Sequence, residues 1–179
     1  MGNLCVATPA SDIAPALAAY DAELLIAGPS GERRVPMTDF YPGYGRTALG
    51  LGEFVVGVEL PVVPAGQGAA FKNLVRTHAD IAKVTVTAAV VLEDGLCKQA
   101  RIALGSVAPT MFRARAAEAL LEGSELSDEL ILEAAAAAAA EAAPIDDIRS
   151  TAEYRRATAE VLVGRALHKA GQRAREVAR

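Results

Sequence analysis

Aromatic side chains, cysteine and histidine are scarce in this chain, and each shortage excludes a class of function. Four Tyr, four Phe and no Trp in 179 residues offer no stacking platform for single-stranded nucleic acid. Cys5 and Cys97 lie far apart without a Cys-x-x-Cys spacing, so we expect neither a disulfide framework nor a zinc site, and a reducing cytoplasm is the default compartment. His78 and His168 have no metal-ligand partner nearby in the sequence.

Excess positive charge and long apolar runs are also missing. The formal net charge of −4 argues against nucleic acid or an anionic membrane as the main partner. The longest apolar run, residues 134–140, is pure alanine and too short to span a bilayer, and no signal-peptide pattern opens the chain. Because 52% of the residues are hydrophobic, the chain can still bury a substantial core.

The first third of the chain alternates loop, helix and strand signals. Residues 3–9 are predicted to form a loop, and Ser11-Asp12 offers an N-cap for a short helix with Pro15 in its first turn. Two Pro and two Gly within residues 61–68 predict a linker. The predicted strands are 22–27, 33–37 and 54–60, with a turn at 29–31 between the first two.

The remaining two thirds predict a β-meander followed by helices. Apolar residues alternate over 84–92, which indicates a strand with one well-buried face. Asp94-Gly95 favours a type I′ hairpin, because that turn needs positive φ at both central residues. The returning strand is 98–104, and residues 70–76 supply a third strand.

Three helices are predicted after the meander, which makes the fold class α+β. Helix starts are predicted at Pro109-Thr110, at Ser127, and at Ser150 or Thr151, with stops at Gly123 and Pro144 for the first two. The expected buried stripes are Phe112, Ala116, Ala119 and Leu120 in the first helix, and Tyr154, Ala157, Val161 and Gly164 in the third.

Six strings, in order along the chain, resemble one known family. Residues 2–12 (GNLCVATPASD) are similar to the second FAD motif of the flavin subunits of molybdenum hydroxylases, the xanthine and carbon monoxide dehydrogenase group. Residues 101–115 (RIALGSVAPTMFRAR) resemble the signature of that subunit's C-terminal domain. The other four resembling strings are residues 39–47, 53–61, 70–82 and 144–155.

The resemblance implies a fold and a role. Residues 1–62 resemble the second lobe of a vanillyl-alcohol oxidase-type FAD-binding domain, and residues 67–179 resemble the flavoprotein C-terminal domain, a three-stranded antiparallel sheet with a three-helix bundle. In this family, a large subunit holds molybdenum-molybdopterin, a small subunit holds two [2Fe–2S] clusters, and FAD passes electrons to an external acceptor. The family's first lobe, with its Ala-Gly-Gly loop, has no counterpart here, so a separate chain that supplies this lobe is a further implied partner.

The resemblance also implies five cofactor-binding residues, each of which has an ordinary structural reading. Gly2 and Asn3 would approach the pyrophosphate, or belong to a frayed terminus. Asp12 would bind the cofactor, or only cap a helix. Val55 would contact the flavin through its main chain, or only fill the core. Lys72 would be a cation beside the flavin, or a surface lysine.

Several other charged residues are predicted to form ion pairs. Arg76 and Asp80 lie in a loop that borders the flavin in relatives, and a solvated salt bridge is the alternative for them. Four arginines are interpreted as helix-surface or interdomain ion pairs and not as phosphate ligands: Arg113, Arg115, Arg155 and Arg156.

Two functions follow as hypotheses. The chain is either the flavin-binding electron-transfer part of a molybdenum hydroxylase, or a truncated, non-catalytic assembly module that no longer binds FAD by itself. Retention of Asp12 and Lys72 supports the first hypothesis, and the missing lobe supports the second.

Overall fold

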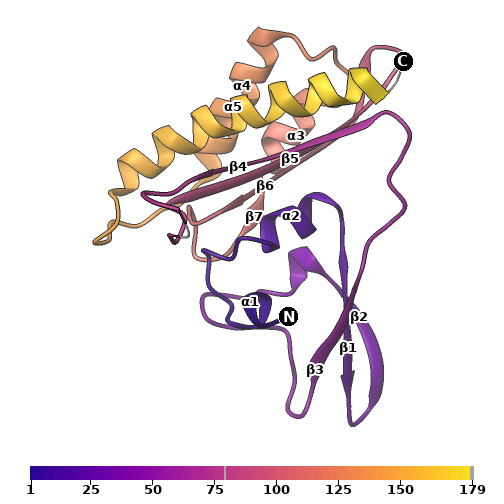
Figure 1. Cartoon of the computed structure of the whole chain (residues 1–179), viewed down its shortest axis with the longest axis vertical. Coiled ribbons are helices and arrows are strands. Elements are labelled where there is room, and N and C mark those ends of the chain that lie inside the picture. The colour runs from indigo at the N-terminus through magenta and orange to yellow at the C-terminus, as the bar shows by residue number, and fades with distance from the viewer. Residues whose placement is uncertain (79, 178–179) are drawn as a thin grey trace.

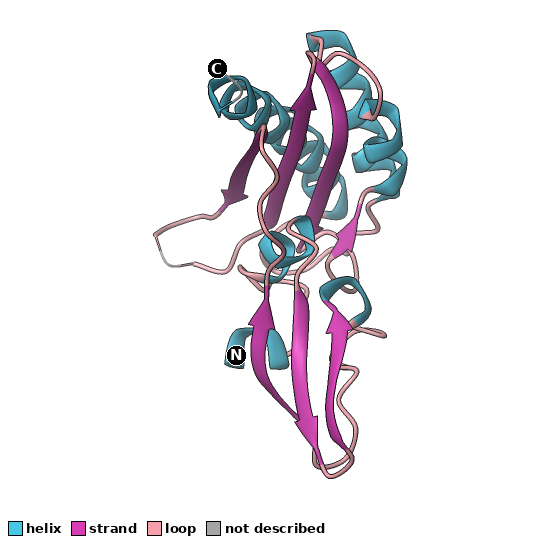
Figure 2. Cartoon of the chain, turned by 90° about the vertical axis from the view of Figure 1, so that its right-hand side faces the viewer, coloured by secondary structure: helices cyan, strands magenta, loops and turns pink. Residues whose placement is uncertain are grey.

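Two antiparallel sheets organise the chain in the computed structural model, which describes residues 1–78 and 80–177 (Figures 1 and 2). The smaller sheet has the strand order β2-β1-β3, and the larger has the order β4-β5-β6-β7. Elements of the first part are α1 (Gly2–Cys5), α2 (Ala14–Ala19), β1 (Glu23–Gly28), β2 (Gly31–Pro36), the 3₁₀ helix η1 (Met37–Asp39) and β3 (Phe54–Glu59). Elements of the second part are β4 (Gln67–Leu74), β5 (Val84–Glu93), β6 (Leu96–Gly105), β7 (Phe112–Arg113), α3 (Arg115–Leu121), α4 (Asp128–Glu141) and α5 (Ala152–Val177).

The smaller sheet buries one face against the N-terminal helices. In its central strand β1, Leu24 and Ile26 are fully buried, and the antiparallel partner of Ile26 on β3 is Val55. Alternate residues of a strand point to opposite faces, so these side chains share one side with the buried Phe40. The three strands predicted for this region are confirmed, but residues 3–9 are not all loop, because α1 forms one helical turn there.

Strand β5 lies at the centre of the larger sheet. The hairpin at Asp94-Gly95 is confirmed, since φ is +52° at Asp94 and +82° at Gly95, as a type I′ turn requires. The expectation of a single buried face was wrong: nine of the ten residues of β5 are buried. Helices α3 and α5 pack on one face of the sheet, with α4 packed against both of them, and α2 with the first part of the chain covers the other face (Figure 1).

The helical region differs from the prediction at its start. Residues 112–113 do not begin a helix, because they pair with β6 as the short strand β7, which gives the predicted three-stranded sheet a fourth strand. Helix α3 therefore starts at Arg115 and buries Ala117, Glu118 and Leu121 in place of the predicted stripe. Packing against the sheet, and not the local helix-start signal, determined both the strand at residues 112–113 and the later start of α3.

The two later helices start where predicted. The Ser127 side chain accepts a hydrogen bond from the Leu130 N–H (3.2 Å), and the Thr151 hydroxyl accepts one from the Tyr154 N–H (3.2 Å). The predicted stripe of α5 was wrong at Tyr154 and Val161, which are each 51% exposed, and at the exposed Ala157, whereas Gly164 is buried as expected. The helix buries instead the row that includes Ala159, Leu162, Val163, Ala166, Leu167, Ala170 and Ala174.

The segment between Glu59 and Gln67 connects the two parts. Each part has a cluster of buried apolar residues, and the first cluster also includes Ala103 and Met111 from the second part. Division into units at residues 62 and 67 stays a prediction. In the described residues, no helix combines the length and apolarity needed to cross a bilayer.

Candidate functional site

Three of the predicted cofactor residues lie on one exposed N-terminal segment. Gly2, Asn3 and Asp12 are all exposed. The Ser11 hydroxyl donates a hydrogen bond to Asn3 Oδ1 (2.5 Å) and accepts one from the Ala14 N–H (3.2 Å) at the start of α2. The N-cap position of α2 is Ile13, and the Ser11 hydroxyl, not the Asp12 carboxylate, accepts the first N–H of the helix, so Asp12 has no capping role.

Two hydrogen bonds from distant residues hold the main chain of the same segment in place. The Tyr41 hydroxyl donates to the Leu4 carbonyl (2.9 Å), and the Ser106 N–H donates to the Pro9 carbonyl (2.7 Å). Burial raises the pKa of Tyr41 to about 12, so its phenol stays protonated and remains a donor at neutral pH. These anchors argue against the frayed-terminus reading of Gly2 and Asn3. Tyr41 and Ser106 lie in two of the family-resembling strings, but no sequence pattern predicted these contacts, because their partners are distant in the chain.

Val55 belongs to the core of the first part. The residue is 9% exposed and shares a buried cluster with Leu4, the neighbour of Asn3. A cofactor contact at this position would use the main chain of β3, and that contact stays a prediction.

Lys72 lies in the other sheet. Its partner on β5 is Val86, which belongs to the core under the helices, and its neighbours Ala70 and Leu74 belong to or pack against that same core. Strand alternation therefore directs Lys72 to the α5 side, whereas the first part of the chain packs on the opposite side. The structure thus groups four predicted residues in the first part and separates the fifth, whose position beside a flavin stays a prediction.

The loop between β4 and β5 carries a surface ion pair. The Arg76 Nε atom lies 3.5 Å from an Asp80 carboxylate oxygen, and the Arg76 side chain is 76% exposed. This geometry fits the plain reading of these two residues as a solvated salt bridge.

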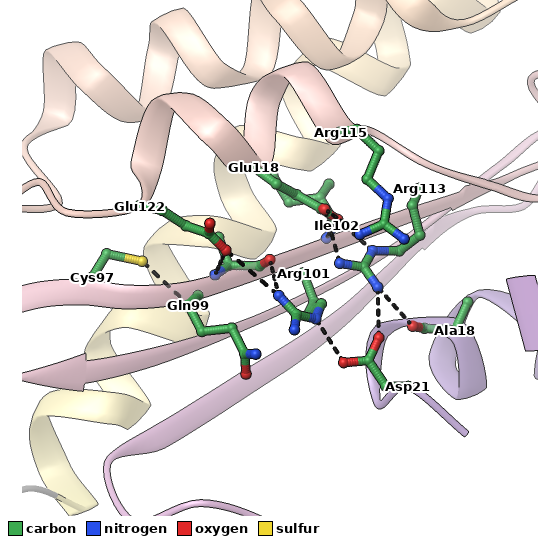
Figure 3. Close-up of polar contacts among 11 residues, drawn as sticks. Ala18, Asp21, Cys97, Gln99, Arg101, Ile102, Arg113, Arg115, Glu118 and Glu122 are labelled. Carbon is green, nitrogen blue, oxygen red and sulfur yellow. Dashed lines mark hydrogen bonds and ion pairs between the residues drawn. The ribbon is translucent and has the colours of Figure 1, made fainter. Parts of the chain in front are cut away.

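A buried arginine joins the two parts of the chain (Figure 3). Arg113, on β7, donates to Glu118 on α3, with a distance of 2.8 Å from Nη2 to Oε2. It also donates to the Asp21 carboxylate (2.8 Å) and to the Ala18 carbonyl (3.3 Å) at the end of α2. The prediction that Arg113 forms an interdomain pair agrees with these contacts, although its burial was not foreseen.

Asp21 is shared between two arginines. Arg101 donates to the second Asp21 oxygen (2.7 Å), and Arg113 donates to the first (Figure 3). Burial works to raise the pKa of Asp21, but hydrogen bonds and charge from Arg101 and Arg113 outweigh it and lower the pKa below its usual value. The carboxylate is therefore ionised at neutral pH and holds α2 against the sheet. By fixing α2, this contact also positions the N-terminal segment that precedes the helix.

A cleft of about 700 Å³ opens beside this ion network. The connecting segment from Leu60 to Pro64 forms one wall, and Ala89, Val91 and Arg101 of the larger sheet form another. The cleft contains none of the five predicted cofactor residues.

Comparisons with known proteins match both parts of the chain. Residues 1–63 match the model of the FAD binding domain in molybdopterin dehydrogenase, and residues 69–170 match the model of the CO dehydrogenase flavoprotein C-terminal domain.

Among curated relatives, the carbon monoxide dehydrogenase medium chain of Afipia carboxidovorans is 34% identical over 174 residues, which cover 97% of this chain and 60% of the relative. The 6-hydroxypseudooxynicotine dehydrogenase complex subunit alpha of Paenarthrobacter nicotinovorans is 34% identical, with 97% of this chain and 59% of the relative covered. The chain thus spans about 60% of the length of these relatives.

Solved structures agree with the sequence matches. The carbon monoxide dehydrogenase of Hydrogenophaga pseudoflava superposes with a TM-score of 0.93 at 36% identity, covering 96% of this chain and 60% of that one. Quinoline 2-oxidoreductase of Pseudomonas putida 86 superposes with a TM-score of 0.88 at 32% identity, covering 97% of this chain and 60% of that one. The protein belongs to the family of FAD-binding medium subunits of molybdopterin-dependent dehydrogenases.

Proposed function

We propose that this chain is the flavin-binding electron-transfer part of a molybdenum hydroxylase. In this function, a large subunit oxidises the substrate at molybdenum-molybdopterin, and a small subunit carries electrons through [2Fe–2S] clusters to FAD and an external acceptor. The observation that carries the proposal is the order of the two family matches, 1–63 then 69–170, along one chain. A cytoplasmic complex is the setting that the cysteine content favours.

The N-terminal segment fits one side of an FAD pyrophosphate. A Cβ added to Gly2 would meet nothing within 4 Å, so a phosphate can approach the main chain there. The Asn3 side chain is held by Ser11, and the exposed Asp12 carboxylate is not used as a cap. Gly2, Asn3 and Asp12 would therefore hold the cofactor, with Val55 contributing its main chain and Lys72 a nearby positive charge.

FAD would supply electron storage between the iron–sulfur clusters and the acceptor. The role of this chain would then be to bind FAD and to fix its orientation. Tyr41 and Ser106 fix the main chain on both sides of the cofactor-binding segment. Asp21, paired with Arg113, fixes α2 and hence the position of Asp12 relative to the larger sheet.

The direct test is flavin content in the assembled complex. The full chain, co-purified with its molybdenum and iron–sulfur subunits and any chain that carries the first lobe, should show the visible absorption bands of bound flavin. Asp12→Asn should reduce FAD occupancy, whereas Asp128→Asn, at a side chain that is 84% exposed on α4, should not. A complex with all subunits and no flavin would favour the assembly module instead.

The isolated chain should bind FAD weakly. Affinity depends on preorganised contacts on both sides of a ligand, and the chain spans about 60% of its relatives. An equilibrium titration of the isolated 179-residue chain with FAD measures this. Nanomolar affinity would contradict the expectation.

A further inference from the structure

The end of β6 forms a seat for the cofactor-binding segment, residues 2–12. The Ser106 N–H donates a hydrogen bond to the Pro9 carbonyl (2.7 Å). The residue before Ser106 is a glycine, and a Cβ added to Gly105 would lie 3.0 Å from Pro15 Cγ and 3.1 Å from the Pro9 oxygen. Because that space is too tight for a larger side chain, the segment lies directly against the main chain at the end of β6.

Ser106 makes this contact in a backbone conformation that it does not favour. Its φ of +65° lies in the left-handed region, which a residue with a Cβ rarely adopts. Such a conformation persists only where surrounding contacts impose it. Pro9 holds the N–H of Ser106, so a contact at the Ser106 carbonyl is needed to fix the peptide groups on both sides of the residue.

Arg155, near the start of α5, supplies the contact at the carbonyl. Its Nη1 atom donates to the Ser106 carbonyl (2.8 Å) and to the Lys83 carbonyl (3.1 Å). Its Nη2 atom donates to both carboxylate oxygens of Asp147 (2.8 Å each), and these charge-assisted hydrogen bonds fix the guanidinium group. A continuous series of hydrogen bonds therefore runs from Asp147 through Arg155 to the seat of the cofactor-binding segment.

Stability alone is a poor explanation for the burial of Arg155. The residue is 5% exposed, and its Nε atom makes no hydrogen bond within the described part of the chain. A buried ion pair often stabilises a fold no more than apolar residues of similar volume do, and an unsatisfied donor carries a further cost. A guanidinium group is suited to a different task, because its planar set of donors can hold carbonyls and a carboxylate in a fixed arrangement.

We propose that Arg155 is a positioning residue for the cofactor-binding segment and that it acts through Ser106. By holding the Ser106 carbonyl, this side chain keeps the Ser106 N–H directed at Pro9. Pro9 lies within the segment, between Asn3 and Asp12. The second part of the chain thereby sets the geometry of the residues proposed to hold the pyrophosphate. This inference rests on the proposed flavin function, but its first test needs no FAD.

Amide hydrogen exchange of the full chain without FAD, followed by NMR, tests the contact. In Arg155→Met, the Ser106 N–H should exchange about tenfold faster than in the wild type, because a hydrogen bond that is no longer held opens more often. Arg156→Met is the matched control, since this exposed neighbour donates to the Ala142 carbonyl (3.3 Å) and should leave Ser106 exchange unchanged. If Arg155→Met does not fold, Arg155→Lys gives the same comparison, because it keeps the charge and loses the planar set of donors.

The FAD affinity of the assembled complex tests the consequence. After its flavin is removed, the Arg155→Met complex should rebind FAD about tenfold more weakly than the wild type, because the segment is less preorganised. The Arg156→Met complex should rebind FAD as the wild type does. Adding Ser106→Gly to Arg155→Met should restore part of the affinity, because glycine adopts the positive φ without outside support. A general loss of stability would not be rescued in this way.

Several results would overturn the proposal. Ser106 exchange that is equal in Arg155→Met and the wild type would do so, as would an equal effect of Arg156→Met, or an unchanged FAD affinity in Arg155→Met. Failure of Ser106→Gly to restore any affinity would also contradict it. A wild-type complex without flavin would instead refute the proposed function, and the exchange comparison would then decide the positioning role by itself.

Discussion

Replacing Arg113 with methionine should destabilise the whole chain, because this side chain links its two parts. The Arg113 side chain is 2% exposed and that of its partner Glu118 is 5% exposed. Arg113→Met leaves the Glu118 carboxylate buried with the Ile102 N–H (2.8 Å) and the distant Arg115 (3.4 Å) as its remaining donors. Removing one member of a buried pair costs about 3–5 kcal/mol, and we expect a loss within that range.

Equilibrium unfolding in urea, followed by circular dichroism, measures the effect. Arg115→Met is the matched control, because its side chain is 64% exposed and contacts the same Glu118. A surface pair of this kind contributes about 0–1 kcal/mol. The double variant Arg113→Met with Glu118→Leu should recover part of the lost stability, since it removes both buried charges.

The result that would refute this reasoning is specific. If Arg113→Met lies within about 1 kcal/mol of the wild type, the pair contributes no more than a surface pair and does not hold the two parts together. If the double variant is as unstable as the single variant, the loss arises from packing and not from an unpaired carboxylate.

Three further predictions concern packing, pH and the flavin. In Gly68→Ala, the added Cβ would lie 2.1 Å from the Ala170 carbonyl oxygen and 2.2 Å from Ala174 N, so α5 must move off β4. We expect a loss of about 3 kcal/mol or more in urea unfolding, whereas Gly164→Ala, whose Cβ would lie 3.9 Å from Ala135 Cβ, should be tolerated. The pKa of Asp21 is lowered from 3.8, so its stabilising effect is present above that pH and is lost as the pH falls through the lowered folded value. Stability measured from pH 6 to pH 2 (roughly the carboxylate range) should therefore fall less steeply in Asp21→Asn than in the wild type, and equal slopes would contradict the role of Asp21. Lys72→Met should lower the flavin reduction potential of the assembled complex if Lys72 lies beside the ring; an unchanged potential with FAD bound would identify an ordinary lysine on the α5 side.

Local signals in the sequence determined most of the elements. Apolar alternation predicted β5, and Asp94-Gly95 predicted its hairpin, because a period of two and a turn that needs positive φ depend only on neighbouring residues. The helix starts at Ser127 and Thr151 follow from capping, because each side chain accepts a hydrogen bond from the backbone N–H three residues later. The family resemblance rests on such local strings too, and the comparisons bear it out.

Tertiary structure decided which contacts form between segments that are distant in the sequence. Residues 112–113 form a strand because they pair with the edge of β6. This pairing outweighs the helix-start signal at Pro109-Thr110. Arg113 and Asp21 are 92 residues apart in sequence, so no local pattern could pair them. The orientation of Lys72 toward α5, and the meeting of Ser106 with Arg155, likewise depend on how the sheet packs between two layers. Local preferences select elements, but burial on both faces of β5 determines which side chains meet.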